Sequence, residues 1–319
     1  MAHTQLTLAQ RYEIFAFHQA SITIFQIAKH LGVHRSTVYR EIERNSHNGR
    51  YHPETAQQIL KERKRAAKPR KISAQAWHLI ETLLCLDFSP EQITGFLKRT
   101  GAYSVSHEWI YQYVLADKAA GGTLWKHLRW SHKKRRKRYG KHDRRGSIPN
   151  RVSIDERPAI VDHKRRIGDW EIDLATGKGR GGYLVVAVER KTLHTVIKWT
   201  PNKQAATVTK AILAMLAPYC KHIKTITVDN GKEFSHHEKI AEALKTKVYF
   251  AHPYSAWERG LNENTIGLIR QYFPKNRSLG FVDPQEVEFV QNRLNNRPRK
   301  TLEYRSPNEL FLNVVAIGT

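Results

Sequence analysis

Three acidic residues in the second half of the chain have the types and positions that metal-dependent phosphate chemistry needs. Asp173 lies in the strand-like run GDWEIDLATG, Asp229 ends the apolar run ITVD, and Glu263 lies in the predicted helix WERGLNENTIGLIRQ, with 33 residues between Asp229 and Glu263. The chain has a formal net charge of +25. In so basic a chain, carboxylates at strand ends and on a helix face are expected to bind a positively charged partner. The obvious candidate is a divalent metal ion, which would in turn bind a phosphate of a polyanionic substrate.

The chemistry expected of these acids is phosphodiester cleavage or transfer. A pair of divalent ions roughly 4 Å apart can activate the attacking oxygen and stabilise the leaving oxygen of a phosphodiester. Mg²⁺ prefers hard oxygen ligands and keeps several waters, so two or three carboxylates with substrate phosphates suffice to hold it. We therefore expect Asp173, Asp229 and Glu263 to bind two Mg²⁺ (or Mn²⁺) ions.

Two more residues of the same predicted helix bear on this site. Arg270 follows Glu263 by seven positions, or two turns, so the two share a face and Arg270 could hold DNA beside the metals. Glu258 precedes Glu263 by five positions and projects from a different side of the helix. We therefore expect Arg270, and not Glu258, to take part in the chemistry.

Each acid also has alternatives. Asp169 and Glu171 are rivals of Asp173 for the first position. The sequence Asp229-Asn230-Gly231 is a common turn, and Glu263 could be an ordinary surface charge, so each alone has a structural explanation. Their combination in one basic chain favours a metal site.

The acids are set in a region of alternating strands and helices that starts near Ile167. Three β-rich runs come first: DWEIDLATG, GYLVVAVERKT and TVIKWTP. There follow a helix over 203–219, the strand ITVD, a helix near 237–244, the strand VYFA and a helix from about 257. An α/β core of this kind places site residues at strand ends and on the adjoining helix.

A C-terminal helix is expected to complete this region. It spans 284–296, with four apolar residues available for packing: Val287, Phe289, Val290 and Leu294. The segment LNNRPRK that follows could contact DNA or close the domain, and the sequence favours neither.

Charge and composition point to a polyanionic partner. There are 54 Lys and Arg against 29 Asp and Glu, and the pI is about 10.1; proteins this basic commonly bind nucleic acid. At 319 residues the chain is long enough for two or more domains. Cys85 and Cys220 lack zinc-ligand spacing, which indicates a reducing compartment. Without a signal peptide or a ~20-residue apolar run, we expect a cytoplasmic, nucleoid-associated protein with no membrane contact.

Residues 1–48 read as an N-terminal helix-turn-helix. In TIFQIAKHLGVHRSTVYREIERN five apolar residues are predicted to face inward: Ile27, Leu31, Val33, Val38 and Ile42. The second helix then directs a set of residues outward that suits phosphates and base edges: Arg35, Ser36, Thr37, Tyr39 and Arg40. An ordinary helical hairpin is the alternative, and the basic outer face favours DNA recognition.

Two helical segments are predicted next. Residues 49–72 read as a helical connector and residues 73–117 as a second helical domain. Ser89 is a predicted cap, followed by proline at the first helical position and glutamine at the third. Trp109, Ile110 and Val114 could form a packed face. This domain is a weaker helix-turn-helix candidate, and DNA reading and simple packing are almost equally supported.

A basic linker over residues 118–155 separates the helical front from the α/β region. Its segment 126–151 holds twelve Lys or Arg and one acid. A solvated linker is one explanation, and a clamp that neutralises DNA phosphates is the one we favour. The clamp would centre on six consecutive residues: Lys133, Lys134, Arg135, Arg136, Lys137 and Arg138.

Several of these motifs occur together in one known family. The helix-turn-helix front, IGDWEIDL, VERKT, TVDNGKEF, PYSAWERGLNENTIGLIRQYFPK and LNNRPRKTLEYRSPNEL span nearly the whole chain. In this combination the chain resembles bacterial insertion-sequence transposases of the IS thirty family, within the DDE transposase and retroviral-integrase superfamily. By that likeness Asp173 is the first acid, because Trp170 stands three residues before it. Asp229 and Glu263 are then the second and third acids, and Arg270 matches the basic residue often found seven positions after the glutamate.

The resemblance implies a multidomain α + α/β protein, in which an N-terminal helix-turn-helix DNA-binding region precedes an RNase H-like, retroviral integrase-type catalytic core over 156–319. It implies a DNA transposase that binds the terminal inverted repeats of its element and uses Mg²⁺ to cut and transfer DNA strands. Bringing two ends together implies at least a homodimer. The rivals are a DNA-binding regulator with a vestigial catalytic domain and a metal-dependent nuclease without strand transfer.

Overall fold

The computed structural model describes residues 5–47, 49–66, 72–129, 148–179, 181–253 and 255–317. The chain divides into two compact units, residues 1–72 and residues 73–319. Over the described residues, no helix is long and apolar enough to cross a membrane. Cys85 and Cys220 are both free and exposed.

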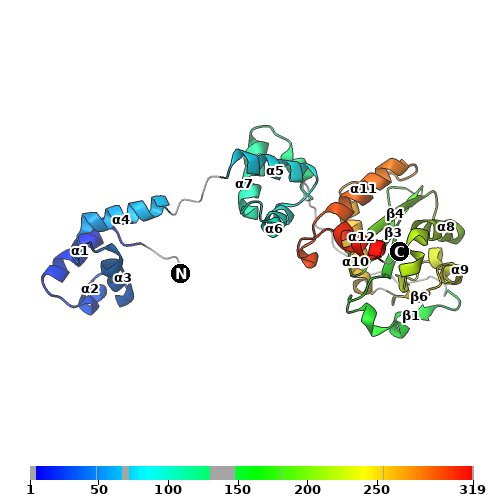
Figure 1. Ribbon diagram of the computed structural model, residues 1–319, viewed down its shortest axis with the longest axis horizontal. Helices are drawn as coiled ribbons and strands as arrows, with labels where there is room; N and C mark the ends of the chain where they lie inside the picture. The colour runs from blue at the N-terminus through cyan, green and yellow to red at the C-terminus, as the bar shows by residue number, and fades with distance from the viewer. Residues whose placement is uncertain are drawn as a thin grey trace. The chain divides into compact units, whose positions relative to one another are not determined.

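The first unit is built from four helices (Figure 1): α1 Leu8–Gln19, α2 Ile24–His30, α3 Arg35–Asn45 and α4 Pro53–Ala66. Thr7 and Thr23 cap α1 and α2 through reciprocal bonds with the glutamine three residues on. Gly32 takes the left-handed conformation (φ +64°) that the turn between α2 and α3 requires. Helices α2 and α3 therefore form the predicted helix-turn-helix.

The predicted inward face of this motif is confirmed. Ile27 and Val38 are fully buried in the core of the first unit, and the other three predicted residues pack against it: Leu31, Val33 and Ile42. Ala56 of α4 is buried in the same cluster, and α4 packs on both α1 and α3. The expected connector helix is therefore part of this compact unit.

The second unit begins with α5 Ala74–Cys85, α6 Pro90–Thr100, α7 His107–Ala119 and the 3-10 turn η1 Leu124–His127. Ser89 caps α6 as predicted, with Pro90 in the first turn. Ile110 and Val114 are buried, but Trp109 is 52% exposed, so its assignment to the packed face is wrong. Successive helical residues are 100° apart, and this turns Trp109 away from the stripe that Ile110 and Val114 share.

Helix α6 and the loop that precedes it pack on the α/β region. The Tyr272 hydroxyl donates to Asp87 at 2.8 Å, and Lys300 pairs with Glu91 at 2.6 Å. Gly95 on α6 lies against the Tyr304 ring so closely that an added Cβ would clash with it. Part of this helical domain therefore serves as a packing surface for the α/β region.

A six-stranded sheet forms the centre of the second unit, in the order β1-β6-β5-β2-β3-β4. The strands are β1 Val152–Ser153, β2 Asp169–Thr176, β3 Tyr183–Glu189, β4 Thr195–Thr200, β5 Thr225–Val228 and β6 Lys247–Phe250. Strands β2, β3 and β4 are antiparallel neighbours, whereas β5 runs parallel to both β2 and β6. The five predicted strands occur in the predicted order along the chain, but β1 was not predicted and lies in the segment assigned to the linker.

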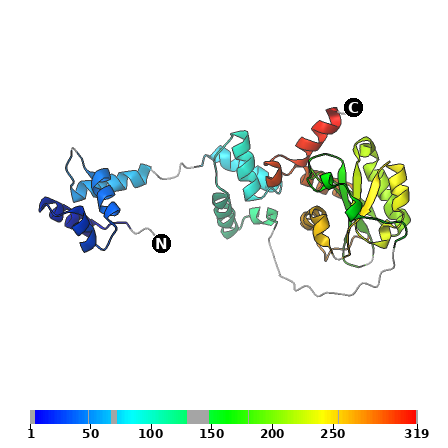
Figure 2. The same cartoon turned by 90° about the horizontal axis from the view of Figure 1, so that it is seen from below.

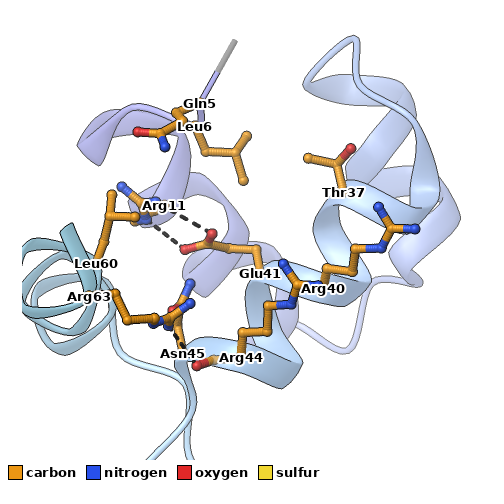
Figure 3. A pocket seen from close by; sticks show the side chains of 10 residues that line it. All are labelled: Gln5, Leu6, Arg11, Thr37, Arg40, Glu41, Arg44, Asn45, Leu60 and Arg63. Carbon is orange, nitrogen blue, oxygen red and sulfur yellow. Dashed lines mark hydrogen bonds and ion pairs between the residues drawn. The ribbon is translucent and has the colours of Figure 1, made fainter. Parts of the chain in front are cut away.

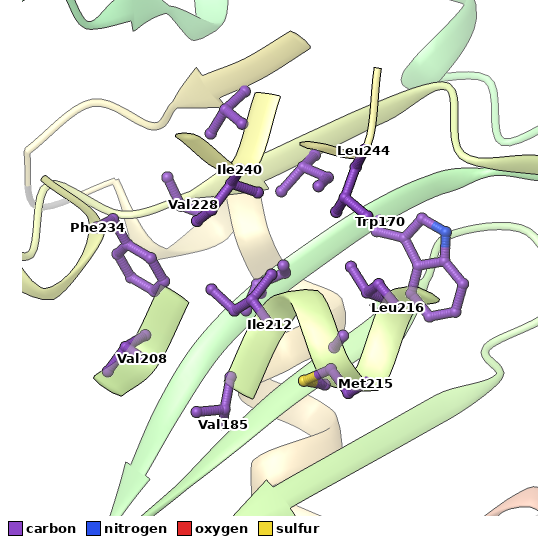
Figure 4. Packing of buried hydrophobic residues seen from close by; sticks show 14 of the residues in the cluster. Trp170, Val185, Val208, Ile212, Met215, Leu216, Val228, Phe234, Ile240 and Leu244 are labelled. Carbon is purple, nitrogen blue, oxygen red and sulfur yellow. The ribbon is translucent and has the colours of Figure 1, made fainter. Parts of the chain in front are cut away.

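Helices cover both faces of this sheet (Figures 1 and 2), namely α8 Ala205–Leu216, α9 His237–Ala243, α10 Gly260–Ile269, α11 Pro284–Asn296 and α12 Pro307–Ile317. On one face Val185 packs with residues of α8 and α9, around Trp170 and Ile212 (Figure 4). On the other face Val186 packs with residues of α10 and α11. Strand β3 is therefore buried on both sides, and β2 turns its acids toward the face that α10 covers.

Two local predictions need correction. The helix expected from about residue 257 begins as a 3-10 turn, η6 Ala256–Arg259, and becomes α-helical only at Gly260. Phe289 is 49% exposed, while Val287, Val290 and Leu294 are buried, so Phe289 is not part of the packed face of α11. It lies about 100° around the helix from Val290, and the Arg293 guanidinium stacks over its ring at 4.9 Å.

The segment LNNRPRK closes the domain. Arg297 is buried and donates a hydrogen bond from Nη2 to the Tyr272 hydroxyl at 2.7 Å. Arg299 donates to the Leu294 carbonyl at 2.9 Å. Burial, together with the nearby charges of Arg297 and Arg129, lowers the pKa of Arg299 to about 9. These side chains are committed to internal contacts.

Candidate active site and DNA-reading surface

Asp173 and Asp229 lie at the same level of the sheet, where β5 ends. Strands β2 and β5 pair in a register that aligns Asp169 with Thr225 and Glu171 with Thr227. Two residues further on, the same register brings Asp173 level with Asp229. Neighbouring strands are about 4.8 Å apart, and alternate residues point to one face. The backbone therefore delivers two carboxylates to one place.

One guanidinium contacts both carboxylates. Nη1 of Arg259 lies 3.1 Å from Oδ2 of Asp173, and Nη2 lies 3.6 Å from Oδ2 of Asp229. Arg259 is the last residue of η6, immediately before α10. Its side chain is 13% exposed, against 25% for Asp173 and 30% for Asp229. The positive charge of Arg259 shows that the aspartate pair accepts a cation.

The environment of Asp173 is unfavourable for its charged form. Burial raises the pKa of Asp173, and the charge of Asp229 raises it further, while Arg259 and the Leu174 backbone N–H act in the opposite direction. Oδ1 of Asp173 accepts that N–H at 2.8 Å, and Oδ1 of Asp229 accepts the Gly231 N–H at 2.9 Å. Each carboxylate therefore keeps one oxygen bound by backbone and turns the other to Arg259.

Glu263 is exposed and lies in the first turn of α10, four residues after Arg259. Among the residues that the structure describes, no group of three His, Cys, Asp or Glu side chains is arranged to hold a metal ion. The structure thus brings Asp173 and Asp229 together and places Glu263 on the adjacent helix, outside that pair.

The two rival acids of β2 are fully engaged elsewhere. Asp169 is buried and accepts two hydrogen bonds from Arg166, each 2.9 Å, and one from the Thr225 hydroxyl at 2.8 Å. Glu171 is buried against Arg190, at 2.5 Å, and the backbone of Asn262. Asp173 is the acid of this strand that faces a second acid.

Arg270 is half-buried at the end of α10. Its Nη1 donates to the Phe273 carbonyl at 3.2 Å, and burial lowers its pKa. This contact fixes the guanidinium at the end of the helix. Arg270 and Glu263 are on the same helix as predicted, but no described contact joins Arg270 to either aspartate.

In the first unit, the predicted reading face of α3 is presented to solvent. Arg35, Tyr39 and Arg40 are exposed, whereas Ser36 and Thr37 are partly buried. The Ser36 hydroxyl lies 2.8 Å from Nδ1 of His34, the residue that caps α3. Neither Arg35 nor Arg40 has a hydrogen-bonding or ionic partner among the described residues.

A basic pocket adjoins this face (Figure 3). It lies between the segment at Gln5 and Leu6, helix α3 and helix α4, and its lining includes Arg40, Arg44 and Arg63. One further arginine is neutralised, because Nε of Arg11 lies 2.6 Å from Oε1 of Glu41. Arg63 donates to the Arg44 carbonyl at 2.8 Å, which ties α4 to the end of α3. The six basic residues proposed for the linker clamp lie outside the described residues: Lys133, Lys134, Arg135, Arg136, Lys137 and Arg138.

Two residues near the acids were not assigned a role from the sequence. Arg259 stands four positions before Glu263 in the motif WERGLNEN, and its charge was the available signal. Glu171 was considered only as a rival ligand, because spacing alone gives no sign that Arg190 neutralises it. Both assignments depend on contacts between elements far apart in the sequence.

Comparisons with protein families place both regions. A helix-turn-helix domain model matches residues 2–45, and an integrase core domain model matches residues 163–256. The second match includes Asp173 and Asp229 and ends before Glu263. The crystal structure of the catalytic core domain of BIV integrase covers 47% of this chain and 97% of its own, with 19% identity and a TM-score of 0.37.

Full-length relatives are more informative. The transposase for insertion sequence element IS4351 from Bacteroides fragilis is 44% identical, covering 97% of this chain and 96% of its own length. Transposase InsI for element IS30A from Escherichia coli (strain K12) is 35% identical, covering 99% and 85%. The transposase for element IS1086 from Cupriavidus metallidurans is 34% identical, covering 99% and 97%. The likeness therefore extends over both units.

Proposed function

The chain belongs to the IS30 family of insertion-sequence transposases, and from that premise we propose how it uses its two units. It is a DDE-type polynucleotidyl transferase that cleaves DNA and transfers strands. Its specific substrate is the pair of terminal inverted repeats of its own element, read by α3. A freed 3′-hydroxyl is then directed into a target phosphodiester, in a homodimer or higher oligomer acting on DNA in the cytoplasm.

The observation that carries this proposal is the pairing of Asp173 with Asp229. Two carboxylates offer hard oxygen ligands, and Mg²⁺ is commonly held by one or two carboxylates with water and substrate phosphates. The guanidinium of Arg259 between them acts as a stand-in cation, so the donor set fits a divalent ion. Asp173 and Asp229 would hold the metal, and Glu263 would add the third carboxylate. When bound, the metal supplies activation of the nucleophile and charge stabilisation of the leaving oxygen.

The protein's own groups perform the remaining tasks. Arg35 and Arg40 bind base edges and phosphates of the element end, since both are exposed and have no partner among the residues that the structure describes. Ser36, Thr37 and Tyr39 complete this surface. Arg270 orients the DNA from the end of α10, and the basic residues at 133–138 neutralise phosphates without reading sequence. Hydroxyl or water is the nucleophile, so no covalent enzyme intermediate is needed.

One assay tests the function directly. The protein is incubated with Mg²⁺, labelled element-end DNA and an unlabelled target, and products are separated by size. We expect nicked ends first and then labelled joints to the target. Cleavage without joints would indicate a nuclease, and end binding with neither product would indicate a regulator. Both outcomes contradict the proposal.

A further inference from the structure

The carboxylate of Glu171 joins strand β2 to the first turn of helix α10. Its Oε2 accepts the backbone N–H of Asn262 at 3.2 Å, and its Oε1 lies 2.5 Å from Nη1 of Arg190. Glu171 is 1% exposed and Asn262 is fully buried. A hydrogen bond to a charged acceptor is stronger than a neutral one, and it strengthens further away from water. The contact is therefore a firm attachment between two elements distant in sequence.

Helix α10 has no side-chain cap of its own. The first N–H groups of a helix have no partner within the helix, and Arg259, at the N-cap position, makes no capping hydrogen bond. A carboxylate placed there satisfies one of these groups and also interacts favourably with the helix dipole. The side-chain amide of Asn262 has no hydrogen-bond partner among the described residues, so it does not anchor the turn. Glu171 caps α10 from the neighbouring strand.

The capped turn lies between the arginine that contacts the aspartates and the third acid of the proposed site. Arg259, which contacts Asp173 and Asp229, comes immediately before α10, and Glu263 comes directly after Asn262. On β2, Glu171 and Asp173 are two residues apart and point to the same face. One buried side chain thus links the strand of the first acid to the helix of the third.

The partner of Glu171, Arg190, is itself held by further contacts. Arg190 donates to the Val161 carbonyl at 3.3 Å and pairs with Asp162 at 3.3 Å. Arg157 also contacts Asp162 and donates to the Thr227 hydroxyl of β5 at 2.9 Å. This network holds the guanidinium of Arg190 in place, so the Glu171 carboxylate has little freedom to move away from α10.

From this geometry we propose that Glu171 is a positioning residue. It fixes α10, the helix that carries Glu263, against the strand of Asp173, and does not bind metal itself. The inference rests on the proposed function, because it assumes that Asp173, Asp229 and Glu263 form the metal site. A buried ion pair that serves only stability is the competing explanation. The two explanations differ in what they predict for metal affinity when the contact between Glu171 and the Asn262 N–H is lengthened.

The test uses Glu171→Asp in the full-length protein. Aspartate keeps the charge beside Arg190 but is one methylene shorter, so it cannot reach both Arg190 and the Asn262 N–H. The matched control is Glu189→Asp on the adjacent strand β3. Glu189 is also fully buried, and it accepts N–H groups of Gly168, Lys191 and Thr192 but does not touch α10. Asn262→Ala, which retains the backbone N–H, is the second control.

Three quantities are measured: Mn²⁺ affinity by calorimetry, amide exchange over residues 260–266, and the Mg²⁺ concentration for half-maximal strand transfer. For Glu171→Asp we expect metal affinity to fall about 10-fold or more, the range typical of residues that support metal ligands. Exchange over 260–266 should rise while affinity for end DNA stays unchanged. Glu189→Asp and Asn262→Ala should match the parent protein in metal affinity, whatever their melting temperatures.

Equal metal affinities for Glu171→Asp and Glu189→Asp would overturn the inference. Should Glu171→Asp fail to fold, Glu171→Gln takes its place. Its neutral oxygen makes a weaker hydrogen bond to the Asn262 N–H than the carboxylate does, so we expect a smaller loss of metal affinity that Glu189→Gln does not show. Asp173→Asn in the same experiment separates the two hypotheses. Full strand transfer by Asp173→Asn would defeat the proposed function and this inference together. Loss of activity in Asp173→Asn with a normal Glu171→Asp would defeat the inference alone.

Discussion

The two units of this transposase place their charged side chains in opposite settings. On α3 of the first unit, Arg35 and Arg40 are exposed, and neither has an internal partner among the described residues. In the α/β region of the second unit, the acids of β2 are buried or half-buried, and each has a named partner. Asp169 binds Arg166, Glu171 binds Arg190, and Asp173 binds Arg259.

This difference matches the role that we propose for each region. A surface that reads DNA must exchange water and counterions for phosphates and bases, so its cations gain nothing from internal partners. A site that positions reacting groups needs side chains whose directions are fixed before the substrate arrives. The structure therefore separates adaptable charge in the first unit from fixed charge in the second.

The largest expected effect lies in the second unit. Changing Asp173, Asp229 or Glu263 singly to its amide keeps the shape of the side chain and removes one charge of the proposed metal site. We expect strand transfer to fall by about 10³-fold or more, since metals supply most of the charge stabilisation. Binding to end DNA should survive, as gel-shift titration of each variant would show.

Glu258→Gln is the matched control for this series. The Glu258 carboxylate accepts the backbone N–H of His252 at 2.8 Å and lies 2.8 Å from Nδ1 of the His252 ring. No described contact joins it to the aspartates. The Glu258→Gln variant should therefore retain most of the strand-transfer activity. An inactive Glu258→Gln beside an active Glu263→Gln would mean that the third acid has been assigned to the wrong glutamate.

In the first unit we expect the opposite result, with DNA binding impaired and the catalytic site intact. Arg35→Ala with Arg40→Ala should weaken binding to the element end about 10- to 100-fold and reduce its preference over random DNA, because a base contact is worth ~1–3 kcal/mol. Competition binding with end and random duplexes measures both quantities. Lys61→Ala, an exposed change on α4, should have little effect. An unchanged preference after the double substitution would remove α3 from the reader's role.

A buried histidine makes the second unit sensitive to acid. His194 stacks on Phe311 with ring centroids 4.2 Å apart, and burial lowers its pKa to about 4 from 6.5. The unfolded chain therefore takes up a proton first as pH falls. Stability present above about pH 6.5 should decline toward pH 4, by about 3 kcal/mol in all.

Urea unfolding at several pH values tests this point. His194→Phe should flatten the decline, whereas changing the exposed His163 to Phe should leave it unaltered. If the parent protein and His194→Phe lose stability equally between about pH 6.5 and 4, the titration of His194 is not the cause.

The smallest effect is expected in the basic pocket beside α3. Arg44 is exposed there and lines the pocket with Arg40 and Arg63. Arg44→Ala should weaken binding to end and random DNA alike and reduce the slope of log affinity against log salt by about 0.9, one phosphate's share. A loss confined to end DNA would instead make Arg44 a base-reading residue.

Sequence reasoning was most successful where a pattern is local. Caps at Thr7 and Ser89, the turn at Gly32 and the alternation of strands all follow from neighbouring residues. The level placement of Asp173 and Asp229 needed the register of β2 on β5, which no local pattern gives. The exposure of Trp109 and Phe289 was missed because apolar type does not specify which side of a helix is covered.

The contacts of Glu171 and Arg259 were beyond sequence reasoning for a related reason. Each charge is satisfied by a residue from another element, and a single sequence offers no sign of which opposite charge is adjacent. Arg297 shows the same limit. Its position in a basic segment was compatible with DNA contact, and the fold buries it against Tyr272 instead.

The central claim is that fixed carboxylates at the end of β5 hold a metal that carries out strand transfer. Asp229→Cys tests it most directly, because a thiolate is a softer ligand that suits Mg²⁺ poorly and is better tolerated by more polarisable ions such as Mn²⁺. The quantity measured is the ratio of strand-transfer rates in Mn²⁺ and in Mg²⁺, for the variant and for the parent protein. We predict that the variant is inactive in Mg²⁺ and recovers part of its activity in Mn²⁺, raising this ratio about 10-fold or more. The same ratio in both proteins, or full activity of the variant in Mg²⁺, would contradict the account.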